Sequence, residues 1–232
     1  MNSRPPTRDP AGPVSLGEAG RALRAGAAVV FPNPAPLTHV VAALRARTVN
    51  EAKGRPAGQP VALWAHHPDT VQQLDGIWGL EPGPAATARR LLVERLLTLL
   101  VPVRDPAELP GWTQPAVKDG WMLMFGARWR PLRPLLDEHP VLYVSSANRT
   151  GRAPAAGTAD ALAMFPAAVP VLAVPPSGPA AGAERSASGP RMATTTVRMH
   201  PDGRLELHRH GAQDRDFADA EGYLEHLRRS AR

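Results

Sequence analysis

Short apolar runs alternate with amphipathic stretches along most of this chain of 232 residues. The apolar runs are a few residues long, which is typical of buried strands. They cover residues 27–31, 61–64, 98–103, 121–125 and 141–144, whereas residues 194–199 and 205–209 flank a turn with Asp202-Gly203 at its centre, which predicts a hairpin. The amphipathic stretches predict helices over residues 15–25, 38–44, 69–74, 84–96, 131–137 and 216–229. Strands separated by helices predict an α/β protein with a mixed sheet.

Three local signals predict where helices begin. Ser15 and Glu18 have the spacing of a capping box, in which each side chain bonds the other residue's backbone N–H. Thr48 and Glu51 repeat this spacing shortly before Lys53. Thr38 is suited to cap a helix over residues 40–44.

Composition divides the chain into three parts. Residues 1–13 are rich in proline and arginine, which predicts a disordered lead-in, and residues 14–211 carry the alternating pattern of a folded domain. Residues 212–232 predict a charged C-terminal helix and tail. Within the domain, residues 175–193 consist mostly of Pro, Gly, Ala and Ser, which predicts a mobile flap.

Composition and charge restrict the class of protein. The chain has no cysteine, so thiolate nucleophiles, iron–sulfur clusters and Cys-ligated zinc are excluded. No apolar run reaches the roughly 18 residues of a membrane span, and we expect a cytoplasmic protein without a membrane partner. The net charge of +6 favours polyanionic partners such as nucleotides or RNA.

Two segments offer groups that bind anions. Lysine is rare here, occurring only at Lys53 and Lys118, and Lys53 lies two residues before Arg55 in Lys53-Gly54-Arg55-Pro56. An ammonium and a guanidinium this close can converge on one phosphate or carboxylate, although both could instead cap the end of a helix.

The second segment is Ser145-Ser146-Ala147-Asn148-Arg149-Thr150-Gly151, directly after the predicted strand 141–144. Its hydroxyls, amide and arginine suit a nucleotide, and α/β sheets bind ligands at the carboxyl ends of strands. The alternative is an ordinary polar loop.

Together the two segments resemble the YrdC family of L-threonylcarbamoyl-AMP synthases. Lys53-Gly54-Arg55-Pro56 follows a strand ending in Phe31-Pro32, the Ser146-Ala147-Asn148 loop follows a late strand, and a Thr195-Thr196-Val197 strand comes after it. The resemblance implies a twisted, open mixed sheet with flanking helices and a concave basic cavity. It also implies a nucleotidyltransferase that uses ATP, Mg²⁺, bicarbonate and a small amino acid for tRNA threonylcarbamoyladenosine synthesis.

The resemblance also implies roles for individual residues. Lys53 and Arg55 would be catalytic, holding the triphosphate and the bicarbonate-derived carboxylate. The further nucleotide-binding residues would be Ser146, Asn148, Thr195, Thr196 and Arg209. The substrate-binding residues would be Asn33, Thr38 and Thr98. No side-chain metal site is expected.

The chain departs from the family pattern at the amino-acid end. The family's Pro-Thr-acid-Thr block is replaced by residues 32–38, which contain three prolines and no acid. Gly126 stands where the family has an arginine, with Arg128 and Arg130 nearby as possible substitutes.

Smaller signals favour structural roles. His66 and His67 point to opposite faces of a strand, which favours surface positions, and His208 and His210 lack a third metal ligand. The arginines around Trp129 could contact tRNA or double-stranded RNA, or simply be solvated.

Three functions stay open: the ATP-dependent enzyme, a paralogous enzyme with another acceptor, and a non-catalytic RNA- or nucleotide-binding module of the same fold.

Overall fold

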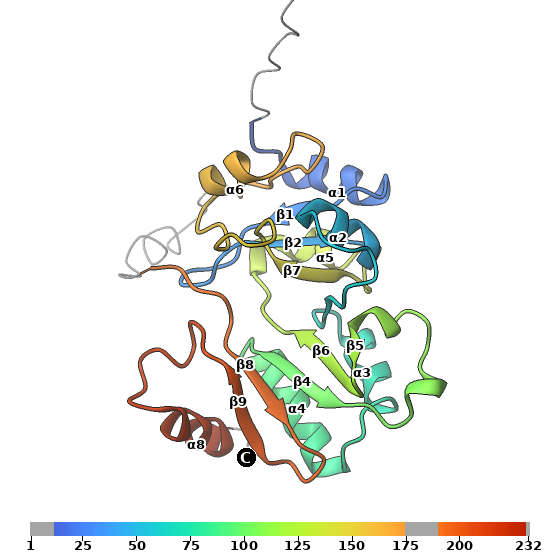
Figure 1. Cartoon of the computed structure of the whole chain (residues 1–232), viewed down its shortest axis with the longest axis vertical. Helices are drawn as coiled ribbons and strands as arrows, with labels where there is room; N and C mark the ends of the chain where they lie inside the picture. The colour runs from blue at the N-terminus through green and yellow to red at the C-terminus, as the bar shows by residue number, and fades with distance from the viewer. Residues whose placement is uncertain (1–11, 175–189, 231–232) are drawn as a thin grey trace, which may run out of the picture.

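A single mixed sheet forms the centre of the computed structural model, which describes residues 12–174 and 190–230 (Figure 1). Nine strands within these residues make up the sheet, in the order β1-β2-β7-β3-β6-β4-β8-β9, with the short β5 paired to β6. The pairs β3/β6 and β4/β8 are parallel and the others antiparallel. The predicted α/β class with a mixed sheet is confirmed.

The strands are β1 (Val29–Phe31), β2 (Val40–Ala43), β3 (Ala62–Trp64), β4 (Thr98–Pro102), β5 (Val117–Lys118), β6 (Trp121–Phe125), β7 (Tyr143–Ser146), β8 (Thr196–Met199) and β9 (Leu205–Arg209). The helices are α1 (Leu16–Arg24), α2 (Ala46–Lys53), α3 (Pro68–Asp75), α4 (Pro82–Glu94), α5 (Arg133–Leu136), α6 (Thr158–Met164) and α8 (Ala220–Ser230). Short 3₁₀ turns cover Pro106–Glu108, Gln114–Ala116 and Arg130–Leu132.

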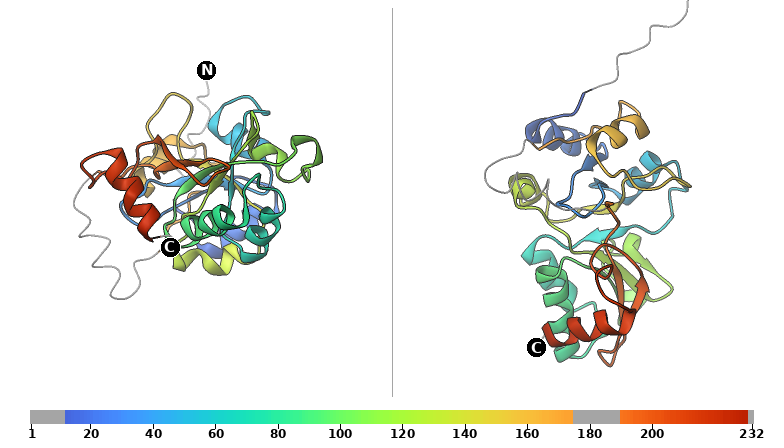
Figure 2. Two further views of the ribbon diagram at one scale, coloured as in Figure 1. Left: turned by 90° about the horizontal axis from the view of Figure 1, so that it is seen from below. Right: turned by 90° about the vertical axis from the view of Figure 1, so that its left-hand side faces the viewer.

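The two faces of the sheet bury separate apolar clusters. Successive residues of β2 show the alternation, because Val41 contributes to one cluster and Ala42 to the other. The first cluster includes buried residues of α2, α3, α4 and α8, whereas the second includes those of α1 and α5. Figures 1 and 2 show α1 and α6 at one end of the molecule and α4 and α8 at the other.

The predicted capping box at the first helix is confirmed. Ser15 is the N-cap of α1, and its backbone N–H donates to Glu18 Oε2 at 2.8 Å. The Glu18 backbone N–H donates to Ser15 Oγ at 3.4 Å.

Two other predicted helix starts are wrong. Residues 40–43 form the fully buried strand β2, paired on both sides with β1 and β7, and Thr38 donates its backbone N–H to Met192 O at 2.9 Å. The β-branched Val40 and Val41 fit this central position better than a helix. The second helix begins after Arg45, so Thr48 lies inside its first turn and caps nothing.

Several boundaries differ from the sequence expectation. The strand expected over 141–144 is β7 at Tyr143–Ser146, so Ser145 and Ser146 belong to the strand itself. The sequence pattern missed α6, and the C-terminal helix begins only at Ala220. The expected lead-in at 1–13 and flap at 175–193 lie outside the described residues except for 12–13 and 190–193.

Gly126 follows β6 where two other backbone segments come close. A Cβ there would lie 2.5 Å from the Leu92 carbonyl oxygen and 2.8 Å from that of Leu97. A side chain here would require the backbone to shift, so a family-type arginine does not fit the local backbone at this position.

Replacing Gly126 with alanine is expected to lower the free energy of unfolding by about 1–3 kcal/mol, because the backbone must shift to admit the methyl group. Urea unfolding of Gly126→Ala measures this. Gly58→Ala is the matched control, since nothing lies within 4 Å of a Cβ at Gly58. Equal urea midpoints for both variants would contradict the close approach.

Candidate functional site

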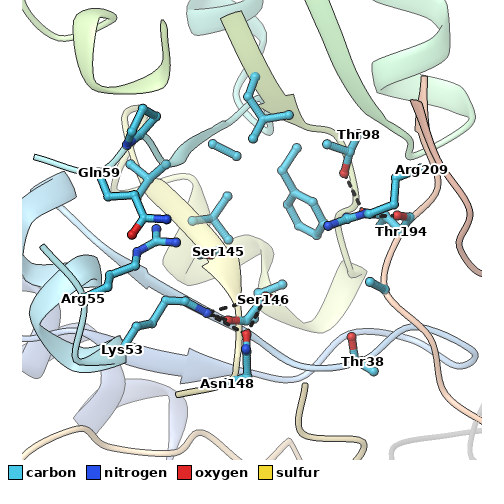
Figure 3. A pocket seen from close by; sticks show the side chains of 18 of the residues that line it. Thr38, Lys53, Arg55, Gln59, Thr98, Ser145, Ser146, Asn148, Thr194 and Arg209 are labelled. Carbon is cyan, nitrogen blue, oxygen red and sulfur yellow. Dashed lines mark hydrogen bonds between the residues drawn. The ribbon is translucent and has the colours of Figure 1, made fainter. Parts of the chain in front are cut away.

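A cavity of about 360 Å³ opens over the sheet and collects most of the predicted site residues. We call it the central cavity. Strands β2, β3, β6, β7, β4 and β9 and the end of α2 contribute to its wall. Figure 3 shows Lys53, Arg55 and Gln59 on one side and Thr98, Thr194 and Arg209 on the other. Its polar and charged lining residues are Asn33, Thr38, Lys53, Arg55, Gln59, Thr98, Ser145, Ser146, Asn148, Thr150, Thr194 and Arg209.

Lys53 is the last residue of α2 and its side chain crosses to β7. The residue is 3% exposed, and its ammonium donates to the Ser146 carbonyl and, at 2.7 Å, to Asn148 Oδ1. Burial, and secondly the nearby Arg55 guanidinium, lower the pKa of Lys53 to about 7. The helix is closed by Gly54, whose backbone is left-handed at φ 66° and whose N–H bonds the last carbonyls. Lys53 therefore does not act as the helix cap.

Arg55 is fixed beside Lys53 by Asn50. Its Nε donates to Asn50 Oδ1 at 2.5 Å, and the Asn50 amide donates to the carbonyls of Ala57 and Gln59, both at 2.8 Å. Burial lowers the pKa of Arg55, and its buried Nη2 has no hydrogen-bond partner among the described residues. This nitrogen is a donor available to a ligand in the cavity.

The segment after β7 is docked onto the end of α2. Ser146 Oγ bonds Asn148 Oδ1 at 2.6 Å, and the Asn148 amide donates to Arg152 O at 2.7 Å. The backbone N–H of Thr150 donates to Lys53 O at 3.2 Å. The two segments singled out from the sequence thus form one side of the cavity, although they are separated by 93 positions at Lys53 and Ser146.

The opposite wall carries the third cation. Arg209, on β9, donates to Thr194 O at 3.3 Å, and burial lowers its pKa. The hydroxyls of Thr194 and Thr98 bond each other at 2.5 Å. Thr98 and Arg209 therefore lie where the sequence placed them, whereas Thr194 was missed.

Thr195 and Thr196 are absent from the residues that line the cavity in the described part of the chain. Thr195 is 0% exposed, and its hydroxyl donates to Asp214 Oδ1 at 2.5 Å. Asp214 also accepts from the Gly211 N–H at 2.7 Å and bonds His210 Nδ1 at 2.6 Å. The bonds between Thr195 and Asp214 fix the backbone next to them, which carries Thr194 and Arg209 into the cavity wall. Asp214 had no motif in the sequence to identify it.

Asn33 and Thr38 lie at a further part of the cavity wall. The Asn33 amide donates to Thr38 O at 2.8 Å, and its buried Oδ1 has no partner among the described residues. Arg191 bonds the carbonyls of Asn33 at 3.0 Å and Leu37 at 2.8 Å. The segment 32–38 is thus tied to residues 191–192, next to the cavity.

The charge of the wall has one sign. Lys53, Arg55 and Arg209 line it, and no aspartate or glutamate appears among the described lining residues. Such an unopposed set of cations attracts phosphates and carboxylates and disfavours ammonium groups.

Arg128 does not replace the family arginine, because it lines a different cavity; neither it nor Arg130 reaches the central one. The expected surface position of His66 is also wrong, since the residue is only 6% exposed.

The described residues contain no cluster of His, Asp or Glu suited to a metal ion. No helix in that part of the chain is long and apolar enough to cross a membrane.

Comparison with known proteins bears on the fold alone. The sequence matches no protein-family model and no curated protein. Among solved structures, P. abyssi Sua5 complexed with L-threonine matches with a TM-score of 0.59 at 18% identity over 84% of this chain and 54% of its own. E. coli YciO matches with a TM-score of 0.59 at 12% identity over 85% of this chain and 89% of its own. The fold is YrdC-like.

Full-length HypF in a phosphate- and nucleotide-bound form matches with a TM-score of 0.59 at 16% identity, over 85% of this chain and 29% of its own. This chain spans only 54% and 60% of the two Sua5 structures that it matches. The structural matches to Sua5, YciO and HypF confirm the YrdC-like architecture expected from the sequence.

Proposed function

We propose that the central cavity binds ATP and that the chain is a nucleotidyltransferase forming a carbamoyl-adenylate. The observation that carries the proposal is the wall of three cations without a carboxylate. Lys53 and Arg55 would hold the triphosphate on one side and Arg209 on the other, and Ser146 and Asn148 would bind the nucleoside. Nucleotide-bound HypF and threonine-bound Sua5, which share the fold, support this use of the cavity.

Mg²⁺ is expected to enter with ATP. This ion prefers oxygen ligands and is usually held by carboxylates together with substrate phosphates. The described cavity wall offers hydroxyl and amide oxygens but no carboxylate. Phosphate oxygens would therefore hold the ion, with hydroxyl and amide oxygens of the described wall as further ligands.

The chemistry needs no side-chain nucleophile. The acceptor amine, once it is neutral, bonds to the carbon of bicarbonate and the C–OH bond breaks. The leaving hydroxide takes the proton that the nitrogen then loses and departs as water. An oxygen of the resulting carbamate then bonds to the α-phosphorus of ATP, and the bond to pyrophosphate breaks. The cationic wall favours the neutral amine over ammonium and neutralises the charge on the phosphates.

Asn33, Thr38 and Thr98 would contact the acceptor. The Asn33 Oδ1 atom without a partner is an acceptor for an amine N–H. The altered segment 32–38 favours two alternatives to the synthesis of L-threonylcarbamoyl-adenylate: an enzyme with an acceptor other than threonine, and a non-catalytic module that binds a nucleotide or RNA. Participation in tRNA modification remains a prediction.

Pyrophosphate release separates these functions. The purified chain is incubated with ATP, Mg²⁺ and bicarbonate and with each amino acid in turn. We expect release with at least one amino acid, dependent on both ATP and bicarbonate. ATP binding without release for any acceptor would contradict the enzyme and leave the binding module.

A further inference from the structure

A second cavity, of about 590 Å³, lies beyond the carboxyl ends of the parallel strands β3 and β6. His66 follows β3 by two residues, Arg128 follows β6 by three, and α3, α4 and α5 supply the rest of the wall. We call it the α3–α5 cavity. Within the described part of the chain, the two cavities share no lining residue. Its volume is within the range of about 300–1,000 Å³ for small-molecule sites, and such sites favour this edge of an α/β sheet.

His66 is a buried polar side chain that faces this cavity. It is 6% exposed, and within the described residues neither ring nitrogen has a hydrogen-bond partner of normal geometry, although the His139 carbonyl lies near. Burial, followed by the charges of His67 and Arg128, lowers its pKa to about 3. At neutral pH the ring is therefore uncharged, with one N–H donor that has only the His139 carbonyl near it and one acceptor nitrogen without a partner among the described residues.

Arg128 gives the cavity one unbalanced positive charge. Asp75 pairs with Arg89 through Oδ2, and Asp137 with Arg133 at 3.8 Å, so each carboxylate of the wall has a guanidinium partner, although the buried Asp75 Oδ1 has no hydrogen-bond partner among the described residues. Arg128 has no carboxylate within ion-pair distance among the described residues. Its Nη2 donates a long hydrogen bond of 3.3 Å to the Ala65 carbonyl. Its buried Nε has no partner in that part of the structure.

The rest of the wall is apolar except for Gln72. Val71 and Leu136 lie in the two hydrophobic clusters and also line the cavity. Val93, on α4, is 41% exposed and lies on the same wall. An apolar ligand body would cover this side chain and gain from the contact.

We propose that the α3–α5 cavity binds a small monoanionic carboxylate with an apolar body. The carboxylate would take the fork of Arg128 and the N–H of His66, and the body would contact Val71, Val93 and Leu136. A single unpaired guanidinium matches one negative charge, and its planar donors suit a carboxylate. The apolar wall disfavours a fully hydrated anion such as phosphate.

Ligand titrations of the full chain test this proposal. Benzoate, phenylacetate and hexanoate are titrated beside their amides, and beside acetate and inorganic phosphate, with ATP present to fill the central cavity. We expect at least one of the three carboxylates to bind about tenfold or more tightly than its own amide, since a charged hydrogen-bonded contact is lost in the amide. It should also bind more tightly than acetate or phosphate.

Variants locate the site. Arg128→Gln should weaken binding of that carboxylate by about tenfold. Arg130→Gln is the matched control, because Arg130 is exposed two residues away and does not line the cavity. An unchanged melting temperature and ATP affinity show that Arg128→Gln is folded. In the native protein, a nuclear Overhauser effect between the bound ligand and the His66 ring gives an independent readout.

Four results would each overturn the proposal. They are no binding by any of the three carboxylates, equal binding of acid and amide, tighter binding of phosphate, and displacement of the carboxylate by ATP. None of them affects the proposed role of the central cavity, which is tested by ATP binding alone.

Discussion

Replacing Lys53 with methionine is expected to weaken ATP binding by about tenfold to a hundredfold, the effect of losing a hydrogen bond to a charged group. The ammonium is buried at 3% exposure and already held by the Ser146 carbonyl and Asn148 Oδ1, so it is preorganised for a phosphate at little cost in side-chain entropy. Methionine keeps the apolar length of the side chain but removes the charge. Isothermal titration with ATP measures the change.

Lys118→Met is the matched control because the chain has only two lysines and Lys118 is exposed on β5, outside the central cavity. This variant should bind ATP as the native protein does. Thermal melting checks that Lys53→Met is folded, since the substitution leaves two buried acceptors without their donor. Unchanged ATP affinity in folded Lys53→Met would show that the lysine has a structural role alone.

ATP affinity is also expected to fall as the pH rises above about 7, by up to about tenfold per pH unit. Burial and the Arg55 guanidinium lower the pKa of Lys53 to about 7, so the free protein loses this charge above that pH. A bound triphosphate favours the protonated form. Binding above pH 7 therefore takes up a proton, and affinity is highest below pH 7, where the lysine is already charged.

The same titrations on Lys53→Met isolate the lysine from other groups, including those of ATP. The ATP affinity of the variant should fall less steeply between pH 7 and 9 than that of the native protein. This range extends to about two pH units above the pKa of Lys53. Parallel curves for the two proteins would contradict the assignment of this titration to Lys53.

The side of the cavity that carries Lys53 and Arg55 could be predicted because its residues carry local signals. Lys53 ends the helix α2 and Arg55 follows it by two residues, whereas Ser146 ends the strand β7 and Asn148 follows it by two. A helix end and a strand end are readable from the chain, and the fold then brings them together. Arg209 was placed through the resemblance alone, since a single arginine in an arginine-rich sequence has no signal of its own.

Other features depend on contacts between distant segments and could not be read from the sequence. Residues 40–43 are all apolar, so their pattern suits a helix or a strand equally well. Only pairing with β1 and β7 determines that they form a strand. Thr195 rather than Thr194 points away from the cavity because Asp214, 19 positions later, accepts its hydroxyl. Position 126 requires glycine because the carbonyls of Leu92 and Leu97 lie too close for a Cβ, and no local sequence pattern predicts this contact.

The position of ATP in a crystal of the protein soaked with MgATP shows whether the central cavity is the nucleotide site. We expect the triphosphate to lie between the Lys53 and Arg55 side and the Arg209 side, with its nucleoside next to Ser146 and Asn148. ATP bound outside the central cavity, or a cavity that stays empty at saturating ATP, would contradict this expectation.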